Sequence, residues 1–321
     1  MKETHFIHHN IEKWRNVEDL IDTDKKDPEA ITNAYEDITA DLAFARTNFP
    51  KSHITIYLNN LAVALHEVIY GVKRENMSHI KRFWTHDMPL TMWDARKELC
   101  IAFIIFVISA LIGVISTLGD TDFPRIILGD QYMDMTLENI SKGTPMAVYG
   151  GESEITSFLG ITVNNIIVSF TIFAMGLLTS LGSGFYLFQN SIMLGAFETF
   201  FWQHGLLEES LLAVFLHGTI EMSSIIVAGA AGIALGNGWL FPGTYSRIQA
   251  FKKSAKRGMR IIIGTVPMYI IAGFIEGFVT RHTEIPDGIR FTIIMISLTF
   301  VIYYYIVLPY QRHKELTHGK D

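Results

Sequence analysis

Two ionisable residues stand inside one long apolar run, residues 217–236, whose sequence is HGTIEMSSIIVAGAAGIALG. His217 and Glu221 are four residues apart, so they share one face of a helix. The same face continues through Ser224, Ala228 and Gly232. Ionisable groups are costly in hydrocarbon, so the pair marks a candidate functional site. The small residues that follow would let a second helix approach closely.

This pair is compatible with three kinds of chemistry. Hydrogen bonds to other helices would hold a bundle in register. A proton or ion path through His217, Glu221 and Glu276 would make the chain a transporter, although its halves show no inverted repeat. An intramembrane metal-dependent hydrolase would use the two residues as zinc ligands, but the HExxH motif is absent. The candidate hydrogen-bond partners are Asn164, Asn165, Gln189, Asn190 and Glu276.

We favour the structural role and therefore predict no catalytic residue, no metal and no cofactor. If a metal were bound, His217 and Glu221 would be its candidate ligands. The predicted intramembrane polar cluster consists of His217, Glu221, Ser224 and Glu276. The predicted helix-packing residues are Ala228, Gly229, Gly232, Gly236, Gly273 and Gly277. Because these small residues lie in the fourth and fifth apolar stretches, we expect those two spans to pack together.

The composition is that of a polytopic membrane protein. Hydrophobic residues make up 49% of the 321 residues, only 18% are charged, and the mean hydropathy is +0.27. Apolar stretches long enough to cross a bilayer lie near residues 99–118, 160–181, 183–201, 210–235, 259–280 and 290–309. Gly182 and Gly184 separate the second stretch from the third. The sequence therefore predicts an all-α protein with about six transmembrane helices.

Several classes of protein are disfavoured by the same data. The single cysteine, Cys100, excludes an intramolecular disulfide and a CxxC zinc site. A net charge of −6 gives no sign of a nucleic-acid partner. The first ninety-odd residues contain no early apolar run, so we expect no cleavable signal peptide.

Charge predicts the orientation, because short cytoplasmic loops carry the excess of Lys and Arg. The expected loop at 236–258 has no acid but contains Arg247, Lys252, Lys253, Lys256 and Arg257. The expected outer loop at 119–159 is rich in acid. We therefore expect both termini, including a tail at 310–321, to be cytoplasmic. The basic residues either set this topology or also bind anionic lipid or an acidic partner.

We predict that residues 1–98 form a cytoplasmic helical bundle. Asp27 before Pro28 is typical of a helix start, and Ser52 suggests a second one. The spacing of Ile56, Leu61, Leu65 and Ile69 predicts a buried helix face. Residues 78–97 mix aromatic and basic side chains, which indicates either an interfacial amphipathic helix or an ordinary bundle helix. In the outer loop, MDMTLENISKG predicts a short helix that ends at Gly143.

Five segments resemble the stage II sporulation protein M family of bacterial integral membrane proteins. HGTIEMSSIIVAGAAGIALG, FPGTYSRIQAFKKSAKRG and the EGF at residues 276–278 resemble the family in general. YLNNLAVALHEVIY and ILGDQYMDMTLENISKGTPMAVYG resemble its long, non-sporulation members. The resemblance covers nearly the whole chain.

The resemblance implies a scaffold or partner-binding component in envelope or peptidoglycan remodelling, located in the bacterial inner membrane. The sporulation-specific member anchors two peptidoglycan-degrading partners. The polar head of this chain departs from that member, so a sporulation role does not follow. The expected partners are membrane lipids and other envelope proteins, peptidoglycan hydrolases among them. A homo-oligomer is an open alternative.

Overall fold

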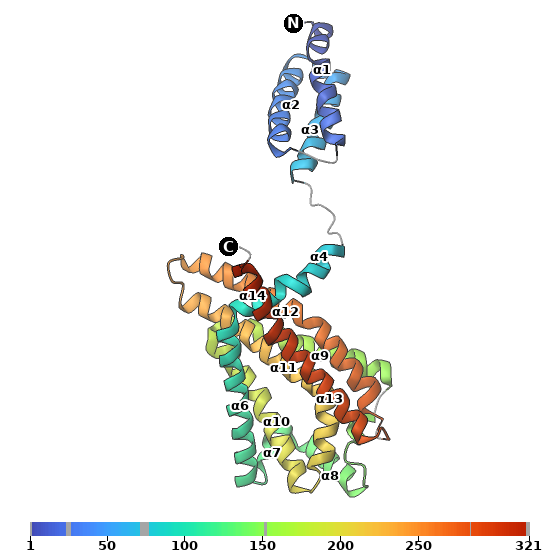
Figure 1. Cartoon of the computed structure of the whole chain (residues 1–321), viewed down its shortest axis with the longest axis vertical. Helices are drawn as coiled ribbons and strands as arrows, with labels where there is room; N and C mark the ends of the chain where they lie inside the picture. The colour runs from blue at the N-terminus through green and yellow to red at the C-terminus, as the bar shows by residue number, and fades with distance from the viewer. Residues whose placement is uncertain (1, 24–26, 71–76, 151–152, 283, 319–321) are drawn as a thin grey trace. The chain divides into compact units, whose positions relative to one another are not determined.

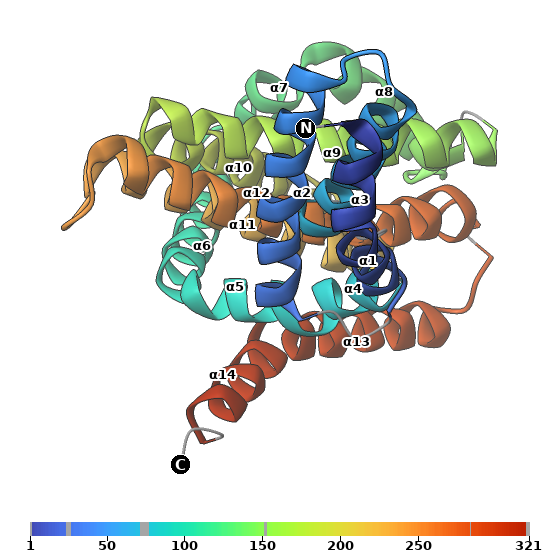
Figure 2. The same ribbon diagram turned by 90° about the horizontal axis from the view of Figure 1, so that it is seen from above.

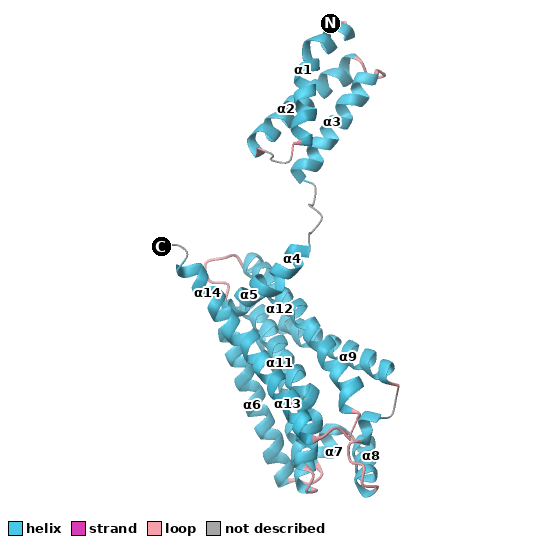
Figure 3. Ribbon diagram, turned by 45° about the vertical axis from the view of Figure 1, so that its right-hand side comes forward, coloured by secondary structure: helices cyan, strands magenta, loops and turns pink. Residues whose placement is uncertain are grey.

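The computed structural model describes residues 2–23, 27–70, 77–150, 153–282 and 284–318. These residues form helices and connecting turns, with no β-strand among them (Figure 3). The chain divides into two compact units, Met1–Ile80 and Lys81–Asp321. The segment that follows Ile80 therefore belongs with the membrane helices, although the sequence placed the boundary at residue 98.

The first unit is a bundle of α1 (Glu3–Asp22), α2 (Pro28–Asn48) and α3 (His53–Tyr70). The carboxylate of Asp27 accepts from the backbone N–H of Glu29, which confirms the predicted start of α2. Ser52 caps α3 in the same manner, because its Oγ accepts from Ile54 N–H at 3.2 Å. The indole of Trp14 is fully buried in the core and donates to Asp41 at 2.8 Å.

The predicted register of α3 is wrong at one end. Ile56 is 59% exposed, whereas Ile54 and Leu58 are buried. Leu61 and Leu65 are buried as predicted. The helix carries two apolar stripes that overlap at Leu61 and Leu65, and only contact with α1 and α2 decides which stripe turns inward.

The second unit opens with a segment that packs on the end of the membrane bundle. It comprises the π-turn η1 (Phe83–Asp87) and α5 (Met88–Asp94). The last two residues of the preceding helix, α4 (Met77–Arg82), also belong to this unit, which begins at Lys81. Met88 and Met92 are buried, and the Trp93 ring stacks on His313 at 4.7 Å. The hydroxyl of Tyr304 donates to the carbonyl of Trp84 at 3.1 Å. This amphipathic segment is therefore tied to the C-terminal helices.

Within the part of the chain that the structure describes, five helical segments are long and apolar enough to cross a membrane. They are α6 (Arg96–Gly119), α9 (Glu154–Ala174) with the 3-10 turn η3 (Met175–Leu178), α11 (Leu207–Leu240), α12 (Arg247–Ile275) with the π-turn η4 (Glu276–Thr280), and α13 (Asp287–Ile302) with η5 (Tyr303–Val307) and α14 (Leu308–His318). A further 24-residue helix, α10 (Ser180–Gln203), is less apolar because it contains Gln189, Asn190 and Glu198. The prediction of a polytopic all-α protein with about six spans is confirmed.

Helix α11 lies at the centre of the second unit. Helices α6, α9, α10, α12 and α13 all contact it (Figure 1, Figure 2). Every residue from Ser224 to Gly236 is buried, so this part of the helix is surrounded on all sides. By contrast, Ile104, Ile108 and Ile115 are exposed along α6, as expected of a helix that faces lipid.

The small residues of α11 allow other helices to approach closely, but most of them contact α9 or α10 and not the predicted partner, α12. A Cβ on Gly232 would lie 2.8 Å from the carbonyl oxygen of Ile172 in α9, and one on Gly236 would lie 2.1 Å from the backbone nitrogen of Ser180 in α10. A Cβ on Gly229 would meet the Leu187 side chain at 2.8 Å.

Gly273 and Gly277 likewise face α9, where added Cβ atoms would meet Thr162 and Phe158. Helices α11 and α12 do pack together, as predicted. Ala228 and Ala231 contribute to that contact, and a Cβ on Gly258 would lie 3.0 Å from the carbonyl oxygen of Ala231.

Two predicted boundaries are wrong. The chain reverses between α9 and α10 at Thr179, whose φ is +84°, and not at Gly182 or Gly184. The expected basic loop at 236–258 is mostly helix, because α11 runs to Leu240 and α12 starts at Arg247. A complete capping box at Ser246 explains that early start.

The expected outer loop, residues 119–159, is also partly helical. It contains α7 (Phe123–Leu128), α8 (Asp130–Ser141) and the 3-10 turn η2 (Ala147–Gly150). Gly143 follows α8 with φ of +73°, which confirms the predicted helix end. The second unit thus carries α7 and α8 at one end and α14 at the other (Figure 1).

Candidate functional site

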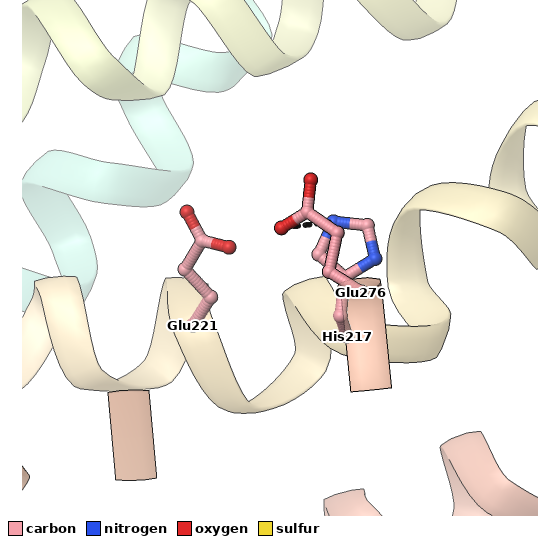
Figure 4. Close-up of side chains that lie close together, drawn as sticks. All are labelled: His217, Glu221 and Glu276. Carbon is pink, nitrogen blue, oxygen red and sulfur yellow. Dashed lines mark ion pairs between the residues drawn. The ribbon is translucent and has the colours of Figure 1, made fainter. Parts of the chain in front are cut away.

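His217, Glu221 and Glu276 come together inside the second unit. One nitrogen or oxygen from each lies within 4.8 Å of the other two. His217 Nε2 and Glu276 Oε2 are 3.6 Å apart and form an ion pair when the imidazole is protonated (Figure 4). His217 and Glu221 project from α11, whereas Glu276 comes from the start of η4. The structure therefore brings Glu276 next to His217 and Glu221, although Glu221, the nearer of the two in sequence, lies 55 positions before Glu276.

A π-turn presents the second carboxylate. Helix α12 continues into η4, where the hydrogen-bond spacing widens at Glu276–Thr280. Single π-turns within helices are frequent at functional sites. Here the turn brings both of its ends to His217, because Glu276 lies beside Nε2 and the Thr280 hydroxyl oxygen lies 3.1 Å from Nδ1.

The contacts of Thr280 fit the tautomer of His217 that carries its proton on Nδ1. The Thr280 hydroxyl donates to the carbonyl of Ile275 at 3.4 Å, so its oxygen is left to accept from His217 Nδ1–H. The lone pair of the imidazole is then on Nε2, directed toward Glu276. Ionised carboxylates also carry only acceptors. Three acceptor groups that face one another need a proton or a cation between them.

The cluster lines a cavity of about 490 Å³. His217 has only 6% of its side chain exposed and Glu276 only 14%. Further polar lining comes from Asn164, Asn165 and Asn190, and the apolar wall includes Leu128 and Val214. The cavity thus combines a few polar groups with a largely apolar wall, which is the usual composition of a binding site.

Asn165 is the least satisfied group in this wall. The residue is 6% exposed, and its Nδ2 has no hydrogen-bond partner among the described residues. Its side chain faces Glu221. A buried amide donor without a partner costs free energy, so its position beside the carboxylates calls for an explanation.

Two of the sequence-predicted residues lie elsewhere. Ser224 is fully buried but does not line the cavity, and its side chain faces Tyr305. Gln189 is likewise outside the cavity wall, unlike its neighbour Asn190.

The predicted basic group is spread over the first turns of α12. Arg257 is partly buried and pairs with Glu98 at 3.1 Å. Lys253 lies 4.8 Å from the centre of the Tyr245 ring. Arg247 begins the helix, and Lys252 and Lys256 are exposed. These side chains do not contribute to the cavity.

Sequence reasoning missed Thr280 and the outer-segment residues Leu128 and Tyr132 of the cavity wall. A helical spacing of four from Glu276 pointed to Thr280, but nothing in the sequence indicated a π-turn. Burial raises the pKa of Tyr132, in α8, above its usual value. This phenol therefore stays protonated at neutral pH and can donate a hydrogen bond.

Two family models match the chain. The model for stage II sporulation protein M matches residues 102–281, which include the helices from α6 to η4 and the whole cluster. A model described as a domain of unknown function (DUF8413) matches residues 4–71, which cover α1–α3. No curated protein and no solved structure matches the chain.

Proposed function

Because the chain belongs to the stage II sporulation protein M family, we propose that it is a membrane scaffold that binds other envelope proteins during peptidoglycan remodelling. One observation carries this proposal. The matched region, residues 102–281, contains most of the membrane helices, whereas residues 4–71 match a different model and fold as a separate unit. A membrane anchor joined to an independent domain is an organisation suited to holding partners at the membrane.

The proposed location is the bacterial inner membrane, with both termini in the cytoplasm. Basic residues gather on the first turns of α12, which the Arg257–Glu98 pair ties to the start of α6. Acidic residues gather around α7 and α8, at the opposite end of the unit (Figure 1). This asymmetry supports the orientation through the positive-inside rule.

Deletion of the gene tests the scaffold proposal. We expect peptidoglycan hydrolases to be lost from the membrane fraction and the muropeptide profile to change. The full chain should restore both, whereas a chain that starts at Lys81 should insert in the membrane but restore neither. Unchanged hydrolase levels in the membranes of the deletion strain would contradict the proposal.

Transport is the second candidate function, because the three ionisable residues line a cavity within the membrane helices. Proton flux into liposomes that contain the purified chain tests it. If the cluster carries protons, the wild type should show proton flux, and Glu221→Gln and Glu276→Gln should each abolish it. A silent wild-type protein, reconstituted in a single orientation with an imposed pH gradient, would exclude this candidate.

A further inference from the structure

The donor set of the cluster matches a transition-metal site. It offers one imidazole nitrogen and two carboxylates, whose ligand atoms lie within 4.8 Å of one another. Tetrahedral zinc with bonds of 2.0–2.2 Å separates its ligand atoms by about 3.4 Å. The 3.6 Å between His217 Nε2 and Glu276 Oε2 is already close to that value. Small rotations of the glutamate side chains would bring the third ligand into range.

The Nδ1 atom of His217 makes the kind of hydrogen bond that orients a metal-binding imidazole. In metal sites the nitrogen that does not bind the ion donates to a fixed acceptor, which orients the ring. Thr280 Oγ1 is that acceptor here, at 3.1 Å from Nδ1. The hydroxyl is itself anchored on the carbonyl of Ile275. The ring is thus oriented before any ion arrives.

Asn165 adds a buried polar group beside one of the proposed ligands, Glu221. Its Nδ2 is buried without a partner and lines the cavity beside Glu221. A water or hydroxide on a metal, or a carboxylate oxygen turned toward it, would satisfy this donor. Asn165 belongs to α9, so it does not share an element with any of the three ligands.

We propose that His217, Glu221 and Glu276 bind one Zn²⁺ ion between α11 and η4, with a remaining coordination position that faces the cavity. The ion would neutralise two carboxylates that are otherwise expensive in a membrane interior. It would also fill the space where three acceptor groups meet. Scaffolding does not require a metal, so this inference goes beyond the proposed function.

The choice of zinc follows from the ligands. Ca²⁺ takes six to eight oxygen ligands, and Mg²⁺ takes oxygen ligands in an octahedron that usually retains several waters. An imidazole together with two carboxylates suits zinc better than either. Three protein ligands and an open position are the arrangement of catalytic zinc sites, whereas structural zinc sites have four protein ligands. The open position faces a cavity large enough for a small molecule, because its volume is about 490 Å³.

The metal content of the full chain, purified in mild detergent and metal-free buffers, tests the proposal. We expect about one zinc per chain in the wild type by mass spectrometry. His217→Gln and Glu276→Gln should each lower the zinc content at least tenfold. Glu198→Gln serves as the matched control, since Glu198 is a partly buried acid of α10 that pairs with Ser210 at 2.8 Å, away from the cluster. This control should retain the wild-type zinc content.

A second measurement keeps the test decisive if the ligand variants fail to fold. Wild-type protein stripped with a chelator should bind one equivalent of Co²⁺, with visible absorption bands typical of four- or five-coordinate cobalt, and Zn²⁺ should displace it. The proposal is overturned if stripped wild-type protein binds neither ion at micromolar concentration. It is equally overturned if a folded Glu276→Gln variant binds as much zinc as the wild type.

Discussion

Thr280 and His217 form a hydrogen bond across two helices, with 3.1 Å between Thr280 Oγ1 and His217 Nδ1. The bond fixes the orientation of the imidazole and directs Nε2 toward Glu276. Its consequence is measurable, because the loss of the partner that orients a ligand typically costs 10–100-fold in metal affinity.

Replacement of Thr280 by valine should therefore weaken zinc binding about 10–100-fold while the shape of the side chain is kept. Thr280→Ser, which retains the hydroxyl, should bind zinc within a few-fold of the wild type. Competition against a chromophoric chelator measures both affinities on metal-free protein. Equal affinities for the valine variant and the wild type would show that Thr280 does not orient the ring.

A methyl group on the small face of α11 should destabilise the bundle. In Gly236→Ala the new Cβ would lie 2.1 Å from the backbone nitrogen of Ser180, so α10 must move away. Overpacking of this kind costs about 1–3 kcal/mol. Gly184→Ala is the control, because its Cβ would make only an ordinary contact at 3.6 Å with Ile105. Thermal unfolding in detergent should show a lower midpoint for Gly236→Ala alone.

The ion pair between Arg257 and Glu98 should stabilise the junction of α6 and α12. The two groups are 3.1 Å apart, with 27% and 13% of their side chains exposed. Removal of one partner leaves the other poorly solvated, so Glu98→Gln should cost on the order of 1–3 kcal/mol. Lys252→Ala, at an exposed basic residue of the same helix, should have almost no effect.

A double-mutant cycle distinguishes loss of the Arg257–Glu98 ion pair from the separate effect of removing either charge. If Arg257 serves only to set topology, the effects of Arg257→Gln and Glu98→Gln on unfolding will add. Coupling of the two substitutions is the result that the geometry predicts.

Tyr57, in the first unit, should ionise only at high pH. Burial and the hydrogen bond that its hydroxyl donates to Glu18 at 3.0 Å raise its pKa to about 12. An unfolded tyrosine has a pKa of about 10. The folded state therefore holds this proton more tightly, and the stability that Tyr57 contributes is present below pH 10 and is lost as the pH rises toward 12.

The absorbance at 295 nm, as a difference between the wild type and Tyr57→Phe, follows this ionisation directly. We expect a midpoint near pH 12, which Glu18→Gln should lower, since the hydrogen bond to Glu18 helps to raise the pKa. A midpoint near 10 in the native protein would mean that the phenol is solvated and lacks this partner.

Local sequence was a sound guide where a few neighbouring residues decide the structure. The helix starts at Asp27 and Ser52 and the end at Gly143 depend on short-range caps, and the structure contains all three. The apolar lengths that predict membrane spans are equally local, because a helix must cover the hydrocarbon thickness by itself. Thr179 shows the limit, since the chain reverses at a threonine with positive φ although glycines stand nearby.

By itself, the sequence determined the membrane class, the approximate number of spans and the ionisable pair at His217 and Glu221, because composition and helical periodicity are properties of single segments. The tertiary structure decided which helix packs against each small residue and which groups lie beside His217 and Glu221. Gly236 faces α10, and Gly277 faces α9. Glu276 and Thr280 reach His217 because the π-turn at the end of α12 packs against α11. Such contacts depend on distant segments that meet in space, and no local pattern records them.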